Sequence, residues 1–158
     1  MAIKAFAARV FAQLVAWKTK RWVSQPVTTQ EKVFRELIRK GSMTRFGKDH
    51  SFDTIRNHQD FIARIPVRDY EALRPYVEKV VAGEPDILWP GKPDYLAKTS
   101  GTTSGAKYIP ITSESIKEQI KASRNAILSY IHETGNTKFV SGKMIFLQGS
   151  PELEKKNG

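Results

Sequence analysis

The stretch "KTSGTTSGAKYIP", from Lys98 to Pro110, decides how the rest of this 158-residue sequence is interpreted. It combines two Gly with several Ser and Thr residues and contains no acid. Such a loop exposes backbone N–H groups, its hydroxyls add hydrogen-bond donors, and a Lys adds positive charge. We therefore expect a phosphate-binding loop whose candidate residues are Ser100, Gly101, Thr102, Thr103, Ser104, Gly105 and Lys107. The alternative is a flexible hairpin linker rich in Ser and Gly.

Three common motifs do not fit this loop. A Walker loop has four residues between its Gly and a Gly-Lys-Ser/Thr sequence, but three residues separate Gly101 from Gly105, and Tyr108 follows Lys107. A nucleophile elbow needs Gly two positions before and after its Ser, whereas Ser104 has Thr and Ala there. The dinucleotide fingerprint Gly-x-Gly-x-x-Gly is absent. No catalytic residue is assigned from these patterns.

The residues around the loop predict an α/β fold. Short apolar runs at Tyr95–Ala97 and Tyr108–Ile111 predict strands on either side of it. A helix is expected from Ser113 to Thr134, ended by Gly135, because isoleucines recur there at helical spacing. Met144–Leu147 predicts a further, buried strand. With helical patterns upstream, the expected order is a helical N-terminal layer followed by strand–loop–strand–helix–strand.

The first 22 residues, "MAIKAFAARVFAQLVAWKTKRW", contain no acid and predict a basic amphipathic helix. Its apolar face comprises Ile3, Phe6, Ala7, Val10, Leu14 and Trp17. Polar residues interrupt the run, whereas a membrane span needs about 20 consecutive apolar residues. We expect the apolar face to pack on the protein's own core. The alternatives are a transit peptide or an interfacial anchor in peripheral contact with a membrane.

Charge is unevenly distributed along the chain. The formal net charge is +10, and residues 1–50 carry 11 Lys and Arg against three acids, a net of +8. A basic half suggests attraction to phosphate on nucleic acid or a membrane, or else a solvated helix face or a face that meets an acidic part of a larger protein. Nucleic acid is not expected, because aromatic residues are not interleaved with the basic ones.

The sequence has no Cys, which excludes a disulfide scaffold and thiolate metal sites. This composition is compatible with the cytosol, and we expect a cytoplasmic protein. The three His residues, at positions 50, 58 and 132, are too scattered to suggest a metal site.

A family resemblance emerges from the loop and the segments before it. "TSGTTSGAKYIP" resembles the nucleotide-binding loop of the adenylate-forming (firefly luciferase-like) superfamily, Ser/Thr-Ser-Gly-Thr-Thr-Gly-x-Pro-Lys. It departs from that pattern because Ser104 precedes Gly105 and no Pro precedes Lys107. Both departures are similar to the Gretchen Hagen type of auxin-responsive plant acyl-amido synthetases and their bacterial relatives, in which an apolar residue and Pro follow, as in Ile109–Pro110.

The same family resemblance extends over roughly residues 31–147. "FGKDHSFDTI", "IPVRDYEALRPY", "GEPDILWPG" and "YLAKTSGTTSG" resemble its N-terminal region in order and spacing. The loop alone is moderately specific, and the loop together with the upstream segments is strongly so.

The resemblance implies an ATP-dependent ligase that uses Mg²⁺. In such enzymes a carboxylate attacks the α-phosphorus of ATP to give an acyl-adenylate and pyrophosphate, and an amine, usually an amino acid, then takes the acyl group. Carried to this sequence, Ser100 to Gly105 would bind the β- and γ-phosphates, and Lys107 would add charge. The implied partners are small-molecule carboxylate and amine substrates and the remainder of the enzyme.

Parts of the family's pattern are not found in this sequence. They are a motif resembling Tyr-x-x-Ser-Glu-Gly, the acid that holds the ribose hydroxyls, and a mobile C-terminal domain. We therefore expect residues 1–158 to be the incomplete N-terminal part of an adenylate-forming enzyme's large domain, inactive by itself. Residues 1–90 are expected to be mainly helical, and residues 91–158 are expected to be α/β with the phosphate-binding loop.

Two other functions remain open from the sequence. An adenylating enzyme that transfers its acyl group to a thiol, such as an aryl-CoA ligase, has a similar loop. A non-catalytic basic module would instead bind anionic membranes or nucleic acid through residues 1–50. Neither the acyl substrate nor the acceptor is identified by the residues present.

Overall fold

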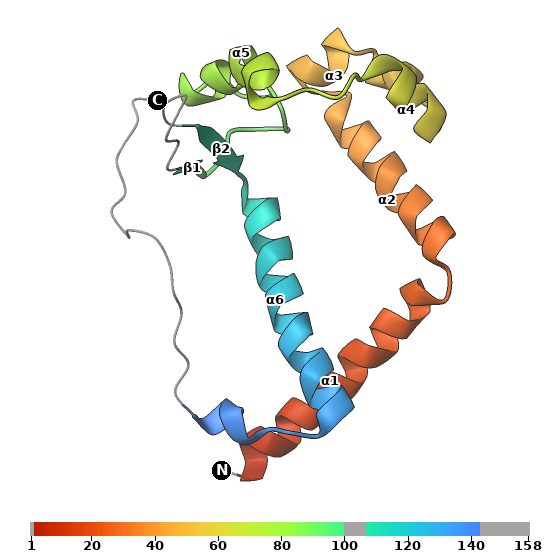
Figure 1. Ribbon diagram of the computed structural model, residues 1–158, viewed down its shortest axis with the longest axis vertical. Coiled ribbons are helices and arrows are strands. Elements are labelled where there is room, and N and C mark those ends of the chain that lie inside the picture. Colours follow the sequence, from red (N-terminus) through yellow and green to blue (C-terminus); the bar gives the residue numbers. More distant parts are fainter. Residues whose placement is uncertain (1, 100–106, 143–158) are drawn as a thin grey trace. The chain divides into compact units, whose positions relative to one another are not determined.

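The computed structural model describes residues 2–99 and 107–142, in which helices predominate and two strands form one small antiparallel sheet (Figure 1). The elements in order are α1 (Ala2–Val23), α2 (Pro26–Gly41), α3 (Arg45–Asp49), η1 (Phe52–Thr54), α4 (His58–Arg64), α5 (Tyr70–Val81), β1 (Tyr95–Lys98), β2 (Tyr108–Ile111), α6 (Ser113–Thr134) and η2 (Lys138–Ser141). The expected α/β fold, with helices before the strands, is confirmed. The strand expected at Met144–Leu147 lies outside the described residues.

The chain divides into two compact units. The described parts of unit 1 are residues 2–27 and 116–142, and those of unit 2 are residues 28–99 and 107–115. Unit 1 therefore contains α1, most of α6 and η2, whereas unit 2 contains the short helices and the β-hairpin.

Unit 1 is held together by a small apolar core between α1 and α6. Ala12 and Val15 of α1 pack with Leu128 and Ile131 of α6, and all four are at most 6% exposed. Ala8, Phe139 and Val140 pack partly buried against them. The contact between the two helices is therefore made by a few small and medium-sized apolar side chains.

This packing corrects the expectation for the first helix. The helix forms as predicted, but its large apolar residues do not face the core. Ile3, Phe6, Val10, Leu14 and Trp17 are between 43% and 84% exposed. The expected face was wrong because helical periodicity identifies an apolar face without identifying a partner for it. The opposite face, made of smaller residues, is the one that packs on α6.

Unit 2 is organised around a tight elbow between α2 and α3. Thr44 is 1% exposed, and its hydroxyl donates to the Gly41 carbonyl at 2.7 Å while it accepts from the Gly47 N–H at 3.0 Å. Thr44 thus caps the N-terminus of α3. A Cβ added at Gly47 would lie 1.9 Å from the Gly41 carbonyl oxygen, so the elbow needs Gly at position 47.

The start of α3 also fixes the segment that leads to the hairpin. The N–H groups of Arg45 and Phe46 donate to the carbonyls of Asp86 and Ile87 at 2.7 and 3.0 Å. These are helix N-terminal N–H groups that have no partner within the helix. Asp86 in turn closes a compact loop with Gly91, whose N–H donates to the Asp86 carboxylate at 2.7 Å. Ile87 is 5% exposed and anchors this loop in the core of unit 2.

The β-hairpin and the start of α6 complete unit 2. β1 and β2 pair antiparallel, with Tyr95 opposite Ile111 and Lys98 opposite Tyr108. Both predicted strands are confirmed, β1 being one residue longer than expected. The predicted helix Ser113–Thr134 is confirmed at both ends.

None of the helices among the described residues has the length and apolar content required to cross a membrane.

The elbow leads to a prediction about stability. Gly47→Ala should lower the free energy of unfolding by about 1–3 kcal/mol or more, because the new methyl group collides with backbone rather than with a mobile side chain. Urea unfolding of the 158-residue chain measures the change. Gly142→Ala is the matched control, since the added Cβ would lie 3.4 Å from its nearest neighbour. Equal stability of the two variants would contradict the close contact.

Candidate phosphate-binding site

The base of the predicted phosphate-binding loop is a closed β-hairpin. The last described rung is a hydrogen bond from the Thr99 N–H to the Lys107 carbonyl at 2.9 Å. It continues the β1–β2 ladder by one step beyond the pair Lys98–Tyr108. Of the predicted site residues, Lys107 lies within the described part of the chain. The others, Ser100, Gly101, Thr102, Thr103, Ser104 and Gly105, lie outside it.

Lys107 is half-buried beside an aromatic ring. Its ammonium nitrogen lies 5.3 Å from the centroid of the Tyr70 ring, within the range of a cation–π contact. Across residues 2–99 and 107–142, no carboxylate pairs with this ammonium group. The ring orients the positive charge without neutralising it, which leaves the charge available to an anion.

Tyr70 also holds the backbone of β2. Its hydroxyl accepts a hydrogen bond from the Tyr108 N–H at 2.8 Å, and the same hydroxyl lies 3.4 Å from the Tyr108 carbonyl oxygen. Tyr70 is the first residue of α5, directly after the N-cap Asp69, whose carboxylate accepts from the Ala72 N–H. One side chain therefore contacts both the cation and the strand that carries it.

Sequence reasoning did not identify Tyr70 as a site residue. The positions of Tyr70 and Tyr108 are 38 residues apart, so no local spacing relates them. The sequence around Tyr70, "IPVRDYEALRPY", carries the family resemblance and a helical pattern, and neither indicates this contact.

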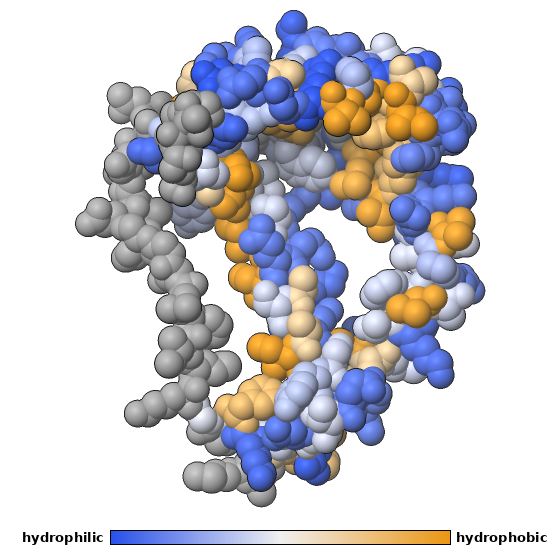
Figure 2. Space-filling view, in the orientation of Figure 1, coloured by the Kyte–Doolittle hydropathy of each residue, from blue (hydrophilic) through white to orange (hydrophobic). Residues whose placement is uncertain are grey.

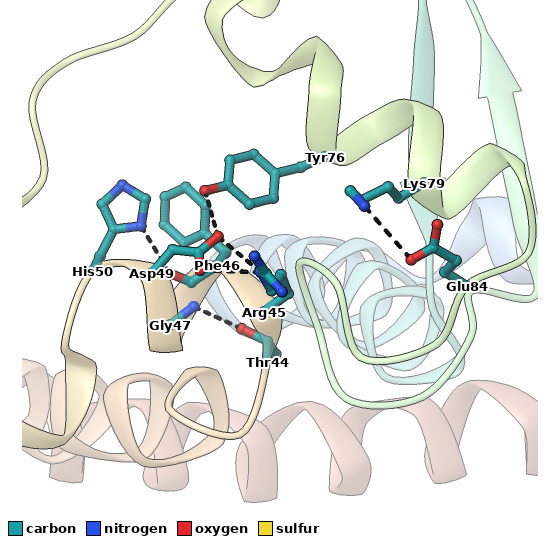
Figure 3. A network of polar contacts seen from close by, with 9 residues as sticks. All are labelled: Thr44, Arg45, Phe46, Gly47, Asp49, His50, Tyr76, Lys79 and Glu84. Carbon is teal, nitrogen blue, oxygen red and sulfur yellow. Dashed lines mark hydrogen bonds and ion pairs between the residues drawn. The ribbon is translucent and has the colours of Figure 1, made fainter.

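The orientation of α5 is secured by a polar network with α3 (Figure 3). Asp49 of α3 accepts from the Arg45 guanidinium at 3.1 Å and from the Tyr76 hydroxyl at 3.0 Å. The rings of Phe46 and Tyr76 meet edge to face, with centroids 5.2 Å apart. A hydrogen bond and a ring contact thus join the same two helices, which hold α5 and its first residue, Tyr70, in place.

His50 is a second junction of this network. The Arg68 guanidinium lies 2.8 Å from His50 Nε2, and His50 Nδ1 lies 2.7 Å from the Phe46 carbonyl oxygen. A guanidinium group only donates, so Nε2 accepts and Nδ1–H donates to the carbonyl. The imidazole ring also stacks on Phe46 with a centroid distance of 4.1 Å. Arg68, which lies between α4 and α5, is thereby attached to α3.

The network shifts the pKa values of Asp49 and Tyr76. Burial acts to raise the pKa of Asp49, but hydrogen bonds from Arg45 and Tyr76 outweigh it and hold that pKa below the ordinary value of 3.8. Burial and the hydrogen bond to Asp49 raise the pKa of Tyr76 above 10.0. Both shifts favour the arrangement in which a neutral phenol donates to a carboxylate.

The other end of β2 is fixed by the start of α6. The N–H of Ser115 donates to the Thr112 hydroxyl at 3.2 Å, and the N–H of Thr112 donates to the Ser115 hydroxyl at 3.0 Å. This reciprocal cap resembles a capping box. Lys40 of α2 forms an ion pair with Glu114 at 3.1 Å, and the hydrogen bonds that its ammonium group donates to Glu114 and Glu36 raise its pKa.

Unit 2 also carries an open depression of about 450 Å³. Ile38 and Ile55 form its buried floor with two Phe rings, and three Arg residues line its rim: Arg35, Arg39 and Arg56. Apolar residues gather over the neighbouring end of α2 and over α3 and α4, as the orange surface shows (Figure 2). No predicted phosphate-site residue lines this depression.

The sequence matches a known family. The family model described as "GH3 family N-terminal domain" matches residues 18–158. Indole-3-acetic acid-amido synthetase GH3.15 of Arabidopsis thaliana is 30% identical over 132 residues, which are 82% of this chain and 22% of that protein. Indole-3-acetic acid-amido synthetase GH3.2 of Arabidopsis thaliana is 29% identical over 91 residues, 56% of this chain and 16% of that protein. The chain belongs to the GH3 family.

A rice relative matches a shorter stretch of the chain. Probable indole-3-acetic acid-amido synthetase GH3.13 of Oryza sativa subsp. japonica is 40% identical over 58 residues, 35% of this chain and 12% of that protein. The family resemblance seen in the sequence is therefore confirmed, and with it the α/β N-terminal region of a GH3 enzyme. The relatives are named as amido synthetases, which are ligases, and the chain spans about a fifth of the length of the first, 22%.

Removing the Tyr70 hydroxyl should loosen the base of the loop. In Tyr70→Phe the ring stays beside Lys107, but the Tyr108 N–H loses the acceptor at 2.8 Å. The loss should reduce stability by about 0.5–1.5 kcal/mol, the net contribution of a typical intramolecular hydrogen bond. Hydrogen exchange should show faster exchange at the Tyr108 amide. Tyr95→Phe, at a position 50% exposed, is the control and should leave this amide unchanged.

The lowered pKa of Asp49 predicts acid sensitivity. Its ionised form is favoured in the folded protein, so its contribution to stability is present above the ordinary value of 3.8 and lost as pH falls through the lower folded pKa. Wild-type stability should fall in this acid range more steeply than that of Asp49→Asn. Urea unfolding between pH 6 and pH 3 compares the two. Asp53→Asn, at an exposed position, is the control and should keep the wild-type dependence of unfolding free energy on pH. Parallel curves of unfolding free energy against pH for wild type and Asp49→Asn would contradict the role of the network.

Proposed function

We propose that this chain supplies the polyphosphate-binding hairpin of an ATP-dependent ligase that joins a carboxylate to an amine. The observation that carries the proposal is the ammonium group of Lys107, held by the Tyr70 ring at the hairpin base without a carboxylate partner among the described residues. The hairpin belongs to a GH3 N-terminal domain, and relatives of this chain are named amido synthetases. These names support the formation of an amide from a carboxylate and an amine.

In this proposal the chain binds and orients phosphate groups. Ser100 to Gly105 offer backbone N–H groups and hydroxyls to the β- and γ-phosphates of ATP, and Lys107 adds one positive charge. No group of three or more His, Asp or Glu side chains that could hold a metal occurs in the described part of the chain. Mg²⁺ keeps several waters and binds substrate phosphates, so in this proposal it would be bound together with the nucleotide.

The reaction proposed for the whole enzyme has two steps. A carboxylate oxygen of the acid bonds to the α-phosphorus, and the bond to the bridging oxygen breaks, so that pyrophosphate leaves with its negative charge. The amine nitrogen then bonds to the acyl carbon, AMP leaves, and the nitrogen gives up one proton. The hairpin contributes by positioning the leaving pyrophosphate and stabilising its charge.

The substrates follow from the names of the relatives. These proteins are named for indole-3-acetic acid, so an arylacetate is the first acyl substrate to test, with an amino acid as the acceptor. The parts that would align the adenine, the ribose and the carboxylate are proposed to lie in the remainder of a larger protein. The 158-residue chain alone should therefore not catalyse adenylation.

Lys107→Ala should weaken catalysis in the full product of the gene that contains this sequence. One charged contact to phosphate contributes about 1–3 kcal/mol, so kcat/KM for ATP should fall by about ten- to a hundredfold. ATP–pyrophosphate exchange with an arylacetate measures this effect. Lys107→Arg should retain more activity than Lys107→Ala, because it keeps the charge.

Lys98→Ala is the matched control, since Lys98 ends the facing strand, is exposed and should affect exchange little. Unchanged kinetics in Lys107→Ala would remove Lys107 from the site. Acyl transfer to a thiol but to no amine would assign the enzyme to the CoA-ligase type. Exchange by the 158-residue chain above its own Lys107→Ala control would show that the chain holds a complete site.

A further inference from the structure

One face of α1 carries large apolar side chains that the described structure leaves exposed. We call Ile3, Phe6, Val10, Leu14 and Trp17 the α1 stripe; their exposed fractions are 84%, 70%, 43%, 52% and 58%. The spacings of three and four residues place them on one side of a helix with about 3.6 residues per turn. Single exposed apolar residues are ordinary, but a continuous stripe on one helix face marks an interaction surface.

The α1 stripe does not turn towards the core of unit 1. The side of α1 opposite to it carries Ala8, Ala12 and Val15, which pack on Leu128 and Ile131. Arg9 also donates to the Gly135 carbonyl at 3.2 Å, at the end of α6. These contacts fix the rotation of α1 about its own axis, so the stripe faces away from α6.

Positive charges border the α1 stripe on both sides. On a helix of about 3.6 residues per turn, Lys18 lies along one border and Lys20 along the other, whereas Arg9 is bonded to the end of α6. Arg21 lies over the Trp17 ring at 5.2 Å. α1 contains no acidic residue, and the first acid of the chain is Glu31. An apolar stripe flanked by cations is the arrangement of helices that lie in the plane of a membrane interface.

We infer that α1 binds the surface of a membrane that contains anionic phospholipids, with the α1 stripe inserted among the acyl chains. The charge of α1 is complementary to lipid phosphates and repels a second copy of the same face. The stripe also lies before residue 18, where the match to the GH3 N-terminal domain begins, so it is separate from the region shared with the family. Because no described helix can span a membrane, the contact is peripheral.

Vesicle sedimentation tests this binding with the 158-residue chain. Wild type should sediment with vesicles of phosphatidylcholine and phosphatidylglycerol, should bind pure phosphatidylcholine at least about tenfold more weakly, and should be released as salt rises. Phe6→Glu/Leu14→Glu should lower binding to the anionic vesicles at least about tenfold. Ile120→Glu, at a position of α6 that is 63% exposed, is the matched control and should bind like wild type. Circular dichroism and the unfolding midpoint show that each variant is folded.

Trp17 provides a direct measure of insertion. The chain has three Trp residues, at positions 17, 22 and 89, so Trp22→Phe/Trp89→Phe leaves Trp17 as the sole emitter. Its emission should shift to the blue on anionic vesicles, and brominated acyl chains should quench it. A Trp17 spectrum unchanged by vesicles would overturn the proposal.

Other outcomes identify a different occupant and equally overturn the proposal. Equal binding of folded Phe6→Glu/Leu14→Glu and wild type would show that the α1 stripe does not carry the contact. A dimer that the same variant abolishes, without vesicle binding by wild type, would assign the stripe to a second copy. Vesicle binding by the 158-residue chain but not by the full gene product would show that the rest of that protein covers the stripe.

Discussion

The tight approach of Gly47 to the Gly41 carbonyl is the constraint on which unit 2 depends. No side chain fits at position 47, and the buried Thr44 hydroxyl is hydrogen-bonded to the backbone of both Gly41 and Gly47. The elbow aims the first N–H groups of α3 at the carbonyls of Asp86 and Ile87, which fixes the segment before the hairpin. It also presents Asp49 to Tyr76, which fixes α5. Local sterics in the α2–α3 turn therefore determine the position of elements 30 to 40 residues further along the chain.

The site at the hairpin base is built from contacts rather than from burial. Tyr70 extends from α5 to β2. Its ring contacts the Lys107 ammonium group, and its hydroxyl accepts a hydrogen bond from the Tyr108 N–H. A ring does not compete with an anion for the ammonium group, whereas a carboxylate partner would have to be displaced before a phosphate could bind. Preorganisation of this kind lowers the entropy lost when an anion binds. Helix α5 therefore supplies the supporting side chain, Tyr70, and Lys107 supplies the cation directly before β2.

The sequence predicts those parts of the structure whose causes are local. The isoleucine spacing and the flanking Ser113 and Gly135 give α6 both of its ends, and the short apolar runs give both strands. Lys107 was predicted from its chemistry, and the structure describes it at the hairpin base. Its role in phosphate binding stays a prediction, as do the roles of residues 100–105. Periodicity predicted the wrong face of α1, because the spacing of apolar residues does not show which side of a helix meets a partner; Ala12 and Val15 are the residues that pack on α6. Tyr70 and Gly47 escaped notice because their roles arise from neighbours that only the folded chain brings together.

The hydrogen bond between the Thr99 N–H and the Lys107 carbonyl has a consequence for how this protein can evolve. It extends the ladder, which pairs Tyr95 with Ile111 and Lys98 with Tyr108, by one further hydrogen bond of 2.9 Å. Described residues on both strands therefore contribute to the register before the connection begins. The entropy of closing such a connection changes slowly, by about 0.6 kcal/mol for each doubling of its length. Homologous proteins can therefore change the sequence or the length of the connection while they keep the same pair of strands. Under the proposed function, natural selection can change phosphate recognition separately from the strands that support the connection.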